Sequence, residues 1–465
     1  MTHPSRTPAV LQSLLGELVT ALDLSTAQAA NLQVQGSDSL DSCFPVSELA
    51  TAAIGVAGLA AADLLAEGAP AGPVQVDRHL AAAWFKTSLR PLGWELPAVW
   101  DPVTGDYRTR DGWLRLHANA PHQRERALAV LGCANNQADV AEAMAHWTGE
   151  ALETAIVAAG GCAARLRTQV EWQAHPQGQA VRAEPLIAQE WTAIATARDW
   201  RPDPQRPLRG IRVLDLTRIL AGPIATRLLA GLGAEVLRID PPDWDEPAQG
   251  PEVTLGKRCA RLDLRRPADR RVFEALLEEA DVLVHGYRAD ALERLGYGAA
   301  ERRALNPALI DVSLCAYGWS GPWALRRGYD SLVQLSCGIA AAGRDWQQAQ
   351  QPVPLPVQAL DHATGYLMAA AVIRGLTGRL REGCTLSARL SLARTACLLT
   401  EHPAVASAPL YTGVQDADYD ATPEPTAWGP ALRLRPPLQI GDLRLHWPRP
   451  ATRLGSASAA WSTAG

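Results

Sequence analysis

The sequence predicts an α/β protein in which a doubly wound parallel sheet is joined to a small α+β domain. Between residues 211 and 314, short β-branched and leucine-rich segments alternate with helical segments, which is the pattern of successive strand–helix–strand units. Residues 101–200 lack this alternation, because helical stretches there follow one expected strand at 111–120. The charged segment 198–210 carries three prolines and separates the two regions as a linker would. We therefore expect the larger region to be Rossmann-like.

The strands of the larger region are identified from short apolar runs, because a strand covered on both faces of a parallel sheet is apolar almost throughout. Strands are expected at residues 211–216, 234–240, 258–264, 281–287 and 308–314, and helices at 221–233 and 267–280. Pro223 suits the first turn of the earlier helix and Gly233 suits its end. In the smaller region, helices are expected around 123–131, 138–146 and 150–159.

The composition is that of an ordinary globular protein of 465 residues, with 47% apolar and 20% charged residues. The net charge of −5 gives no indication of nucleic-acid binding. The eight cysteines are scattered without a CxxC pair, so no metal site is expected. No signal peptide and no uninterrupted apolar window of about 18 residues is found, so we expect no membrane association and a cytoplasmic location.

One acidic residue, Asp361, lies in an apolar neighbourhood. The stretch PVQALDHATG (356–365) places it directly before an alanine-rich helical run. One interpretation is a helix N-cap, in which the carboxylate accepts a hydrogen bond from a backbone N–H of the first turn. The other interpretation is a catalytic carboxylate. These residues by themselves leave both interpretations open.

The chain also contains an internal echo. Residues 44–68 resemble residues 355–378, since each segment has a Pro-Val pair, an alanine-rich helix, a glycine-containing turn and then a short strand-like run. The shared order favours duplication over a mere similarity of composition. In this register Ala50 stands opposite Asp361, so the first copy lacks the acidic residue.

Six segments carry a resemblance to a known family. They are GIRVLDLTRILAGPIATRLLAGLGAEVLRIDPP (210–242), GKRCARLDLRRP (256–267), ADVLVHGYRADALERLGYG (280–298), LNPALIDVSLCAYGWSGP (305–322), RGYDSLVQLSCGIAAAG (327–343) and PVQALDHATGYLMAA (356–370). In content and order they resemble the class III coenzyme-A transferases, which include formyl-CoA:oxalate and carnitine CoA-transferases and the related α-methylacyl-CoA racemase.

The N-terminal half resembles the same family in a different order. Residues 108–133 and 151–180 are similar to its small domain, which in the family follows the aspartate region. The resemblance therefore implies a rearranged fusion. Residues 1–100 are expected to be a partial copy of the aspartate-region segment, 101–200 the small domain, 207–400 the Rossmann-like CoA-binding catalytic domain and 401–465 a C-terminal return segment.

The resemblance implies that Asp361 is a nucleophile. In the family, this carboxylate attacks an acyl-CoA thioester and forms a mixed anhydride, and the released CoA thiolate then gives an aspartyl-CoA thioester. An incoming carboxylic acid repeats the sequence in reverse, while backbone N–H groups can hold the oxyanion. Acyl-CoA and a carboxylic acid are thus the expected partners, as substrates, and no permanently bound cofactor is expected.

The resemblance also implies which residues bind CoA. They are Ile219, Leu220 and Ala221 after the first strand, Leu262, Asp263 and Arg265 near the adenine end, Gly286, Tyr287 and Arg288 in a later loop, and the basic residues Arg294 and Arg327. Arginine suits phosphates because its guanidinium group stays charged and binds bidentately.

Three features depart from the family pattern. His285-Gly286-Tyr287 replaces the usual Glu-Asn-Phe, so one amide contact is missing. The second strand ends in Asp240-Pro241-Pro242, without the arginine that stacks on adenine in some members. The glycine-rich loop that covers the aspartate in the formyl transferases has no counterpart in the sequence.

Other functions and assemblies stay open at this point. An acyl-CoA racemase or epimerase of the same fold needs a histidine where this chain has Tyr329. A non-catalytic CoA-binding paralogue is a second alternative. A dinucleotide enzyme would use Asp240 to bind a ribose, but the first turn lacks G-x-G-x-x-G. Because the family forms interlocked dimers, we expect either a homodimer or a self-contained pseudo-dimer.

Overall fold

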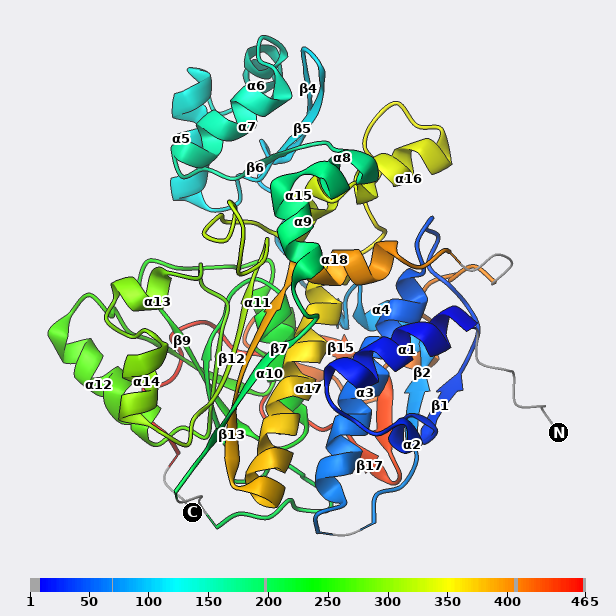
Figure 1. Cartoon of the computed structure of the whole chain (residues 1–465), viewed down its shortest axis with the longest axis vertical. Coiled ribbons are helices and arrows are strands. Elements are labelled where there is room, and N and C mark those ends of the chain that lie inside the picture. Colours follow the sequence, from blue (N-terminus) through cyan, green and yellow to red (C-terminus); the bar gives the residue numbers. More distant parts are fainter. Residues whose placement is uncertain (1–8, 69, 196–198, 405–408, 463–465) are drawn as a thin grey trace.

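The computed structural model describes residues 9–68, 70–195, 199–404 and 409–462. Its central feature is a seven-stranded sheet in the order β10-β9-β8-β11-β12-β13-β7 (Figure 1). The strands are β7 (Ala188–Ala193), β8 (Arg212–Leu216), β9 (Glu235–Asp240), β10 (Lys257–Arg261), β11 (Val282–His285), β12 (Ile310–Cys315) and β13 (Cys384–Ser391). All neighbours pair in parallel except β7, which runs antiparallel to β13. Counted from β8, the parallel strands have the order 3-2-1-4-5-6, so the fold is a doubly wound α/β fold as predicted.

Both faces of this sheet are covered, because successive residues of a strand point to opposite faces. Val213 and Val236 belong to the larger apolar core, whereas Leu214 and Leu237 belong to a second one. The covering helices are α10 (Ala221–Gly231) and α17 (Ala359–Glu382) on the first face, and α12 (Pro267–Glu278) and α14 (Ala299–Leu305) on the second. The five strands and two helices expected between 211 and 314 are confirmed, although the third strand ends early, at Arg261.

Helix α17 packs along α3 (Val46–Leu65), so the two segments of the internal echo lie side by side (Figure 1). Helix α1 (Ala9–Ala21) in turn packs against α3. By length and composition α3 could cross a membrane, but 94% of its most apolar window is buried inside the fold. Its apolar composition is therefore accounted for by its place in the core.

The two copies of the echo share one order of elements. Helix α3, strand β2 (Val74–Asp77) and helix α4 (Arg78–Trp84) correspond to α17, β13 and α18 (Leu392–Thr400). The first copy does not join the large sheet, because β2 lies in a separate four-stranded sheet with β1 (Leu32–Gln35), β16 (Leu438–Ile440) and β17 (Leu443–Arg444). The shared order is consistent with duplication, which stays a prediction.

A smaller unit lies at the top of Figure 1 and has an apolar core of its own. It contains the antiparallel strands β4 (Gly105–Thr109), β5 (Gly112–Leu116) and β6 (Ala163–Arg165), with helices α5 (Pro121–Leu131), α6 (Gln137–Ala145) and α7 (Gly149–Ala158). Helices α8 (Gln169–Ala174) and α9 (Pro176–Ala183) then lead into β7. The chain thus enters the large sheet before the expected linker at 198–210, and the domain boundaries stay a prediction.

The C-terminal segment returns to the N-terminal one. Strand β15 (Gly429–Arg433) pairs with β3 (Leu89–Pro91) and with β14 (Glu424–Thr426), and β16 pairs with β2. Shorter helices complete the described part of the chain: α2 (Thr26–Ala29), α11 (Gly250–Val253), α13 (Ala291–Arg294), α15 (Asp330–Ser336), α16 (Ile339–Gln347) and the 3-10 turn η1 (Asp416–Asp418). The first and last segments of the chain are thus held together by strand pairing.

Candidate active site

A cavity of about 480 Å³ lies where the loops after β8, β9, β10, β11 and β12 meet. Eleven of the twelve residues expected in the site line it: Ile219, Leu220, Ala221, Leu262, Asp263, Arg265, Gly286, Tyr287, Arg288, Arg327 and Asp361. These residues are spread over more than 140 positions of the sequence. They converge because the carboxyl ends of parallel strands meet at one edge of a sheet.

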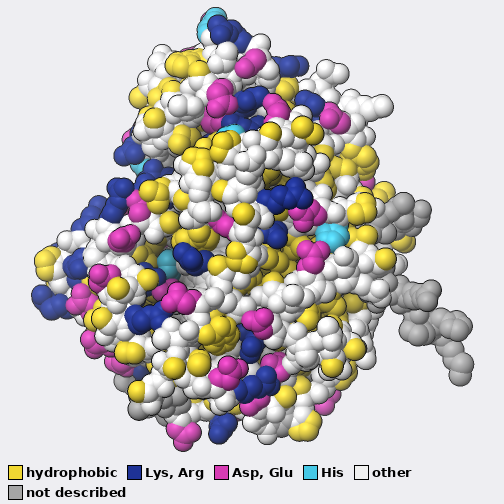
Figure 2. Space-filling model, in the orientation of Figure 1, with side chains coloured by type: hydrophobic (Ala, Val, Ile, Leu, Met, Phe, Trp, Pro, Cys, Tyr) yellow, Lys and Arg dark blue, Asp and Glu magenta, His cyan; other side chains and the backbone are white. Residues whose placement is uncertain are grey.

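The twelfth residue, Arg294, does not line the cavity. Its Nε lies 2.6 Å from Asp290 Oδ2 at the end of α13, and its side chain is 69% exposed. Arg265 is similarly exposed, and its Nε donates to Asp263 Oδ1 at 2.7 Å. Basic side chains are visible over this α12–α14 side of the molecule in Figure 2. Arg327 does line the cavity, and its Nη1 donates to the carbonyl oxygen of Gly160 at 3.2 Å.

The N-cap interpretation of Asp361 is wrong. Helix α17 begins at Ala359, its N-cap residue is Gln358, and no side chain of that residue caps it. Asp361 is therefore the third helical residue, and the residue is 9% exposed, in the wall of the cavity. A carboxylate at this position faces the ligand space and is not used to complete the helix.

The capping role is filled by Asp330, the first residue of α15. Its Oδ2 accepts the backbone N–H of Asp361 at 2.9 Å, and the carboxylate also accepts the N–H of Leu360. Gln334 donates to the other oxygen of Asp330 and accepts the N–H of Leu355 at 2.7 Å. This contact from another helix explains why α17 starts two residues before Asp361.

The neighbouring carboxylate of Asp330 adds to the effect of burial on the pKa of Asp361. Burial raises the pKa of Asp330 to about 6, although its hydrogen bonds oppose the shift. Burial, followed by the charge of Asp330, raises the pKa of Asp361 well above its ordinary value. The Asp361 carboxylate is thus a stronger base than an exposed aspartate, and a stronger base is a stronger nucleophile toward a carbonyl carbon.

The first CoA loop is packed directly against the helix of Asp361. A Cβ at Gly365, one turn after Asp361, would lie 2.4 Å from the carbonyl oxygen of Ala221. Only glycine permits this approach, so α10 and α17 are fixed in register at the cavity. The Ala221 loop and Asp361 therefore form one rigid wall.

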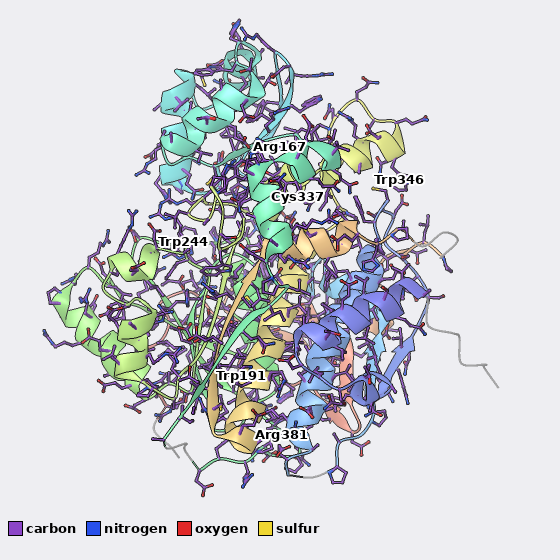
Figure 3. The ribbon with its side chains drawn as sticks, in the orientation of Figure 1. Arg167, Trp191, Trp244, Cys337, Trp346 and Arg381 are labelled. Carbon is purple, nitrogen blue, oxygen red and sulfur yellow. The ribbon has the colours of Figure 1, made fainter. Side chains whose placement is uncertain are left out.

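Tyr287, one of the residues that depart from the family pattern, belongs to an aromatic–arginine stack in another part of the cavity wall. The guanidinium carbon of Arg218 lies 4.3 Å from the ring centroid of Trp244 and 4.9 Å from that of Tyr287. All three residues line the cavity, and Trp244 is labelled in Figure 3. His285 is buried beneath them, with its Nε2 3.3 Å from Asp311 Oδ1. Sequence reasoning missed Arg218 and Trp244. They lie in different loops, after β8 and after β9, and nothing in the sequence indicates that their side chains stack in the folded protein.

The small unit also contributes to the cavity, through His122 and Gln123 at the start of α5. Gln123 Oε1 accepts the Tyr329 hydroxyl at 3.1 Å, and His117 stacks on the Tyr329 ring with centroids 3.8 Å apart. Burial raises the pKa of the Tyr329 phenol further, so this residue is a poor base for racemisation. His362 stacks on Phe85 at 4.9 Å inside the core, away from any such role.

Fold and cavity together define a doubly wound α/β protein whose strand-end loops surround a buried carboxylate. Residues 208–425 match the family model described as CoA-transferase family III. An acetyl-coenzyme A transferase of Hypoxylon pulicicidum is 35% identical over 40% of this chain and 33% of its own length. An acyl-CoA transferase of Gibberella moniliformis is 28% identical over 69% of this chain and 60% of its own length.

A solved structure of a Mycobacterium tuberculosis protein is 30% identical, with a TM-score of 0.38, over 43% of this chain and 59% of its own. The chain thus spans between a third and three fifths of the length of the curated relatives named here.

Proposed function

We propose that this chain is a CoA-transferase that moves coenzyme A between an acyl-CoA thioester and a carboxylic acid. The observation that carries the proposal is the convergence of Asp361 with ten residues of the expected CoA loops on one cavity. The match of residues 208–425 to the family model of CoA-transferase family III supports it. CoA serves as a substrate in this proposal, and no permanently bound group is required.

The proposed reaction proceeds through covalent intermediates on Asp361. The carboxylate oxygen attacks the thioester carbonyl carbon, the C–S bond breaks, and a mixed anhydride and CoA thiolate form. The thiolate attacks the aspartyl carbonyl and releases the acyl group as a carboxylate, which leaves an aspartyl-CoA thioester. The acceptor carboxylate attacks this thioester and gives a second anhydride, from which the thiolate takes the new acyl group and frees Asp361.

The site geometry suits this sequence. Burial leaves the Asp361 carboxylate few water partners, so its negative charge is poorly solvated and its attack on a neutral carbonyl is favoured. The stack of Arg218 and the side chain of Arg327 supply positive charge to the wall where an anionic ligand would lie. The rigid contact between Ala221 and Gly365 keeps the loop and the carboxylate in one relative position.

Calorimetry and an exchange screen test this proposal together. CoA should bind with an affinity that falls as salt is added, because arginine–phosphate contacts are partly screened. A labelled acyl-CoA mixed with a panel of carboxylic acids should yield new thioesters. Binding of NAD without binding of CoA would favour a dinucleotide enzyme, and CoA binding without exchange would favour a non-catalytic paralogue.

A further inference from the structure

Ile219 has a backbone conformation that its side chain disfavours. Its φ is +67°, in the left-handed region, where a β-branched side chain crowds the adjacent backbone. The residue lies in the cavity wall between β8 and α10. Such a conformation persists only where neighbouring contacts hold it, and residues of this kind cluster at functional sites.

Glu246 supplies the holding contact. Its Oε2 accepts the backbone N–H of Ile219 at 2.9 Å, and its side chain is 3% exposed. Its Oε1 pairs with the buried guanidinium of Arg238 in β9. Its carbonyl oxygen accepts the N–H groups of Gln249 and Gly250 at 3.0 and 2.9 Å, so the residue is fixed at the entrance to α11.

Arg238 keeps a second partner of its own. Its Nε and Nη2 donate to the two oxygens of Asp240 at 2.8 and 3.2 Å, and the arginine is fully buried. A change at Glu246 therefore does not leave the Arg238 charge without a counter-ion. This makes substitutions at Glu246 compatible with folding.

The loop is clamped on both sides of Ile219. Upstream, the backbone N–H of Thr217 donates to Asp215 Oδ1 at 2.9 Å. Downstream, Gly222 approaches Thr217 so closely that a Cβ would lie 2.3 Å from its side chain. Because Thr217 and Gly222 are both held, the backbone on either side of Ile219 cannot move to relieve the strain. The conformation of Ile219 therefore determines the shape of the cavity wall.

We propose that Glu246 is a positioning residue for coenzyme A, which acts by holding Ile219 in its left-handed conformation through the backbone N–H. Glu246 itself does not line the cavity and contacts no ligand in this account. The inference rests on the proposed function, because the use of the Ile219 loop as a CoA contact belongs to that function.

The test is a double-mutant cycle with calorimetric CoA affinity as its readout. Glu246→Asp keeps the charge beside Arg238 but withdraws the carboxylate from Ile219 by one methylene. Glu246→Gln keeps the length and removes the charge. Each should raise the Kd for CoA about tenfold or more, since a misplaced loop loses its ligand contacts. Asp245→Asn, a charge loss at the exposed neighbouring residue, should leave the Kd unchanged.

Rescue separates positioning from a general structural role. Glycine takes the left-handed conformation without steric cost, so Ile219→Gly combined with Glu246→Asp should restore the Kd to within about threefold of native. Ile219→Val keeps the β-branch and should not rescue. Native affinity in the Glu246 variants would overturn the inference, and so would a failure of Ile219→Gly to rescue a variant with native circular dichroism.

The same variants are also compared by their thermal unfolding midpoints, a measurement that does not depend on CoA binding. This second measurement tests the role of Glu246 separately from the proposed function. Relative to Ile219→Val, Ile219→Gly should stabilise the Glu246→Asp protein more than it stabilises the native protein, whether or not CoA binds. Equal effects in both backgrounds would reject Glu246 as the holding contact. Lack of CoA binding by the native protein would reject the proposed function. The thermal midpoints would then still test whether Glu246 holds Ile219 in its left-handed conformation.

Discussion

At the scale of single residues, burial and one neighbouring carboxylate, Asp330, set the chemistry of Asp361. Asp330 is 1% exposed, and its Oδ2 accepts the Asp361 backbone N–H at 2.9 Å. It therefore acts in two ways: its hydrogen bonds fix the first turn of α17, and its charge raises the pKa of Asp361 further beyond the effect of burial. The first action positions the nucleophile, and the second makes it more basic.

Asp330→Asn is expected to lower the pKa of Asp361, because the neighbouring negative charge is removed while the burial remains. Attack on a thioester needs the anionic carboxylate, so exchange by the native protein should rise with pH until the raised pKa of Asp361 is passed. In the variant this rise should occur at lower pH, by about one pH unit, in profiles of kcat/KM. Asp345→Asn, at an exposed side chain on α16, serves as the control for charge loss. An unmoved profile in Asp330→Asn would show that the two carboxylates are not coupled.

At this scale, the sequence supplied Asp361 but not its partner. Asp361 and the loop residues were found through the resemblance to a family, which carries residues position by position. Asp330 lies 31 residues upstream of the N–H that it accepts, and nothing along the sequence signals a hydrogen bond between two separate helices. Glu246 and the left-handed conformation of Ile219 were missed for the same reason.

At the scale of elements, the strands were predictable and one helix start was not. Each central strand is buried on both faces, so its apolar run is visible in the sequence. One of the two interpretations of Asp361 placed the start of α17 at that residue, because a local acidic residue often caps its own helix. Asp330 takes over that role from α15, and the helix begins at Ala359. A tertiary contact therefore outweighed the local capping signal.

Gly365→Ala is expected to separate α10 from α17, since the added Cβ would lie 2.4 Å from the Ala221 carbonyl oxygen. The movement should displace Asp361 relative to the Ala221 loop and lower kcat about tenfold or more, with a loss of stability of about 1–3 kcal/mol. Exchange kinetics and chemical unfolding measure the two effects. Gly16→Ala is a matched control on helix α1, where an added Cβ meets nothing within 4 Å. A fully active Gly365→Ala protein would contradict the close-packed wall.

At the scale of the whole molecule, a buried cluster around Glu252 joins three parts of the chain. Its carboxylate accepts the N–H and hydroxyl of Ser88 at 3.1 and 2.6 Å, pairs with Arg227 in α10, and lies 3.5 Å from Arg433 in β15. Burial opposes the charge of Glu252, but Arg227 and Arg433 outweigh it and lower its pKa to about 2. The N-terminal, central and C-terminal segments thus share one ionic contact.

Glu252→Gln is expected to lower the free energy of unfolding by about 2–4 kcal/mol at neutral pH, because Arg227 loses its counter-ion and Arg433 keeps only Glu424. Since the folded-state pKa is depressed, the stabilisation is complete above the ordinary glutamate pKa of 4.5 and is lost as pH falls through about 2. The gap between native and variant unfolding midpoints should therefore narrow in acid. Exposed Glu278→Gln is the control. A gap that stays constant down to about pH 3 would show that charge is not the cause.

The arrangement of the whole chain could be predicted only in part. The internal echo indicated that residues 44–68 and 355–378 share a pattern, and their helices α3 and α17 do lie together. That β15 and β16 pair with strands of the N-terminal segment could not be read from the sequence, because pairing between short strands hundreds of residues apart depends on the finished core.

The most direct measurement of the central claim is covalent trapping on Asp361. The native protein is incubated with an acyl-CoA, treated with hydroxylamine and digested with a protease. The mass of the peptide that contains Asp361 is then measured by mass spectrometry. We expect a hydroxamate on Asp361 in the native protein and none in Asp361→Asn, which should fold normally but lose exchange because a neutral amide does not attack a thioester. An active Asp361→Asn protein, or a hydroxamate on a different carboxylate, would contradict the account.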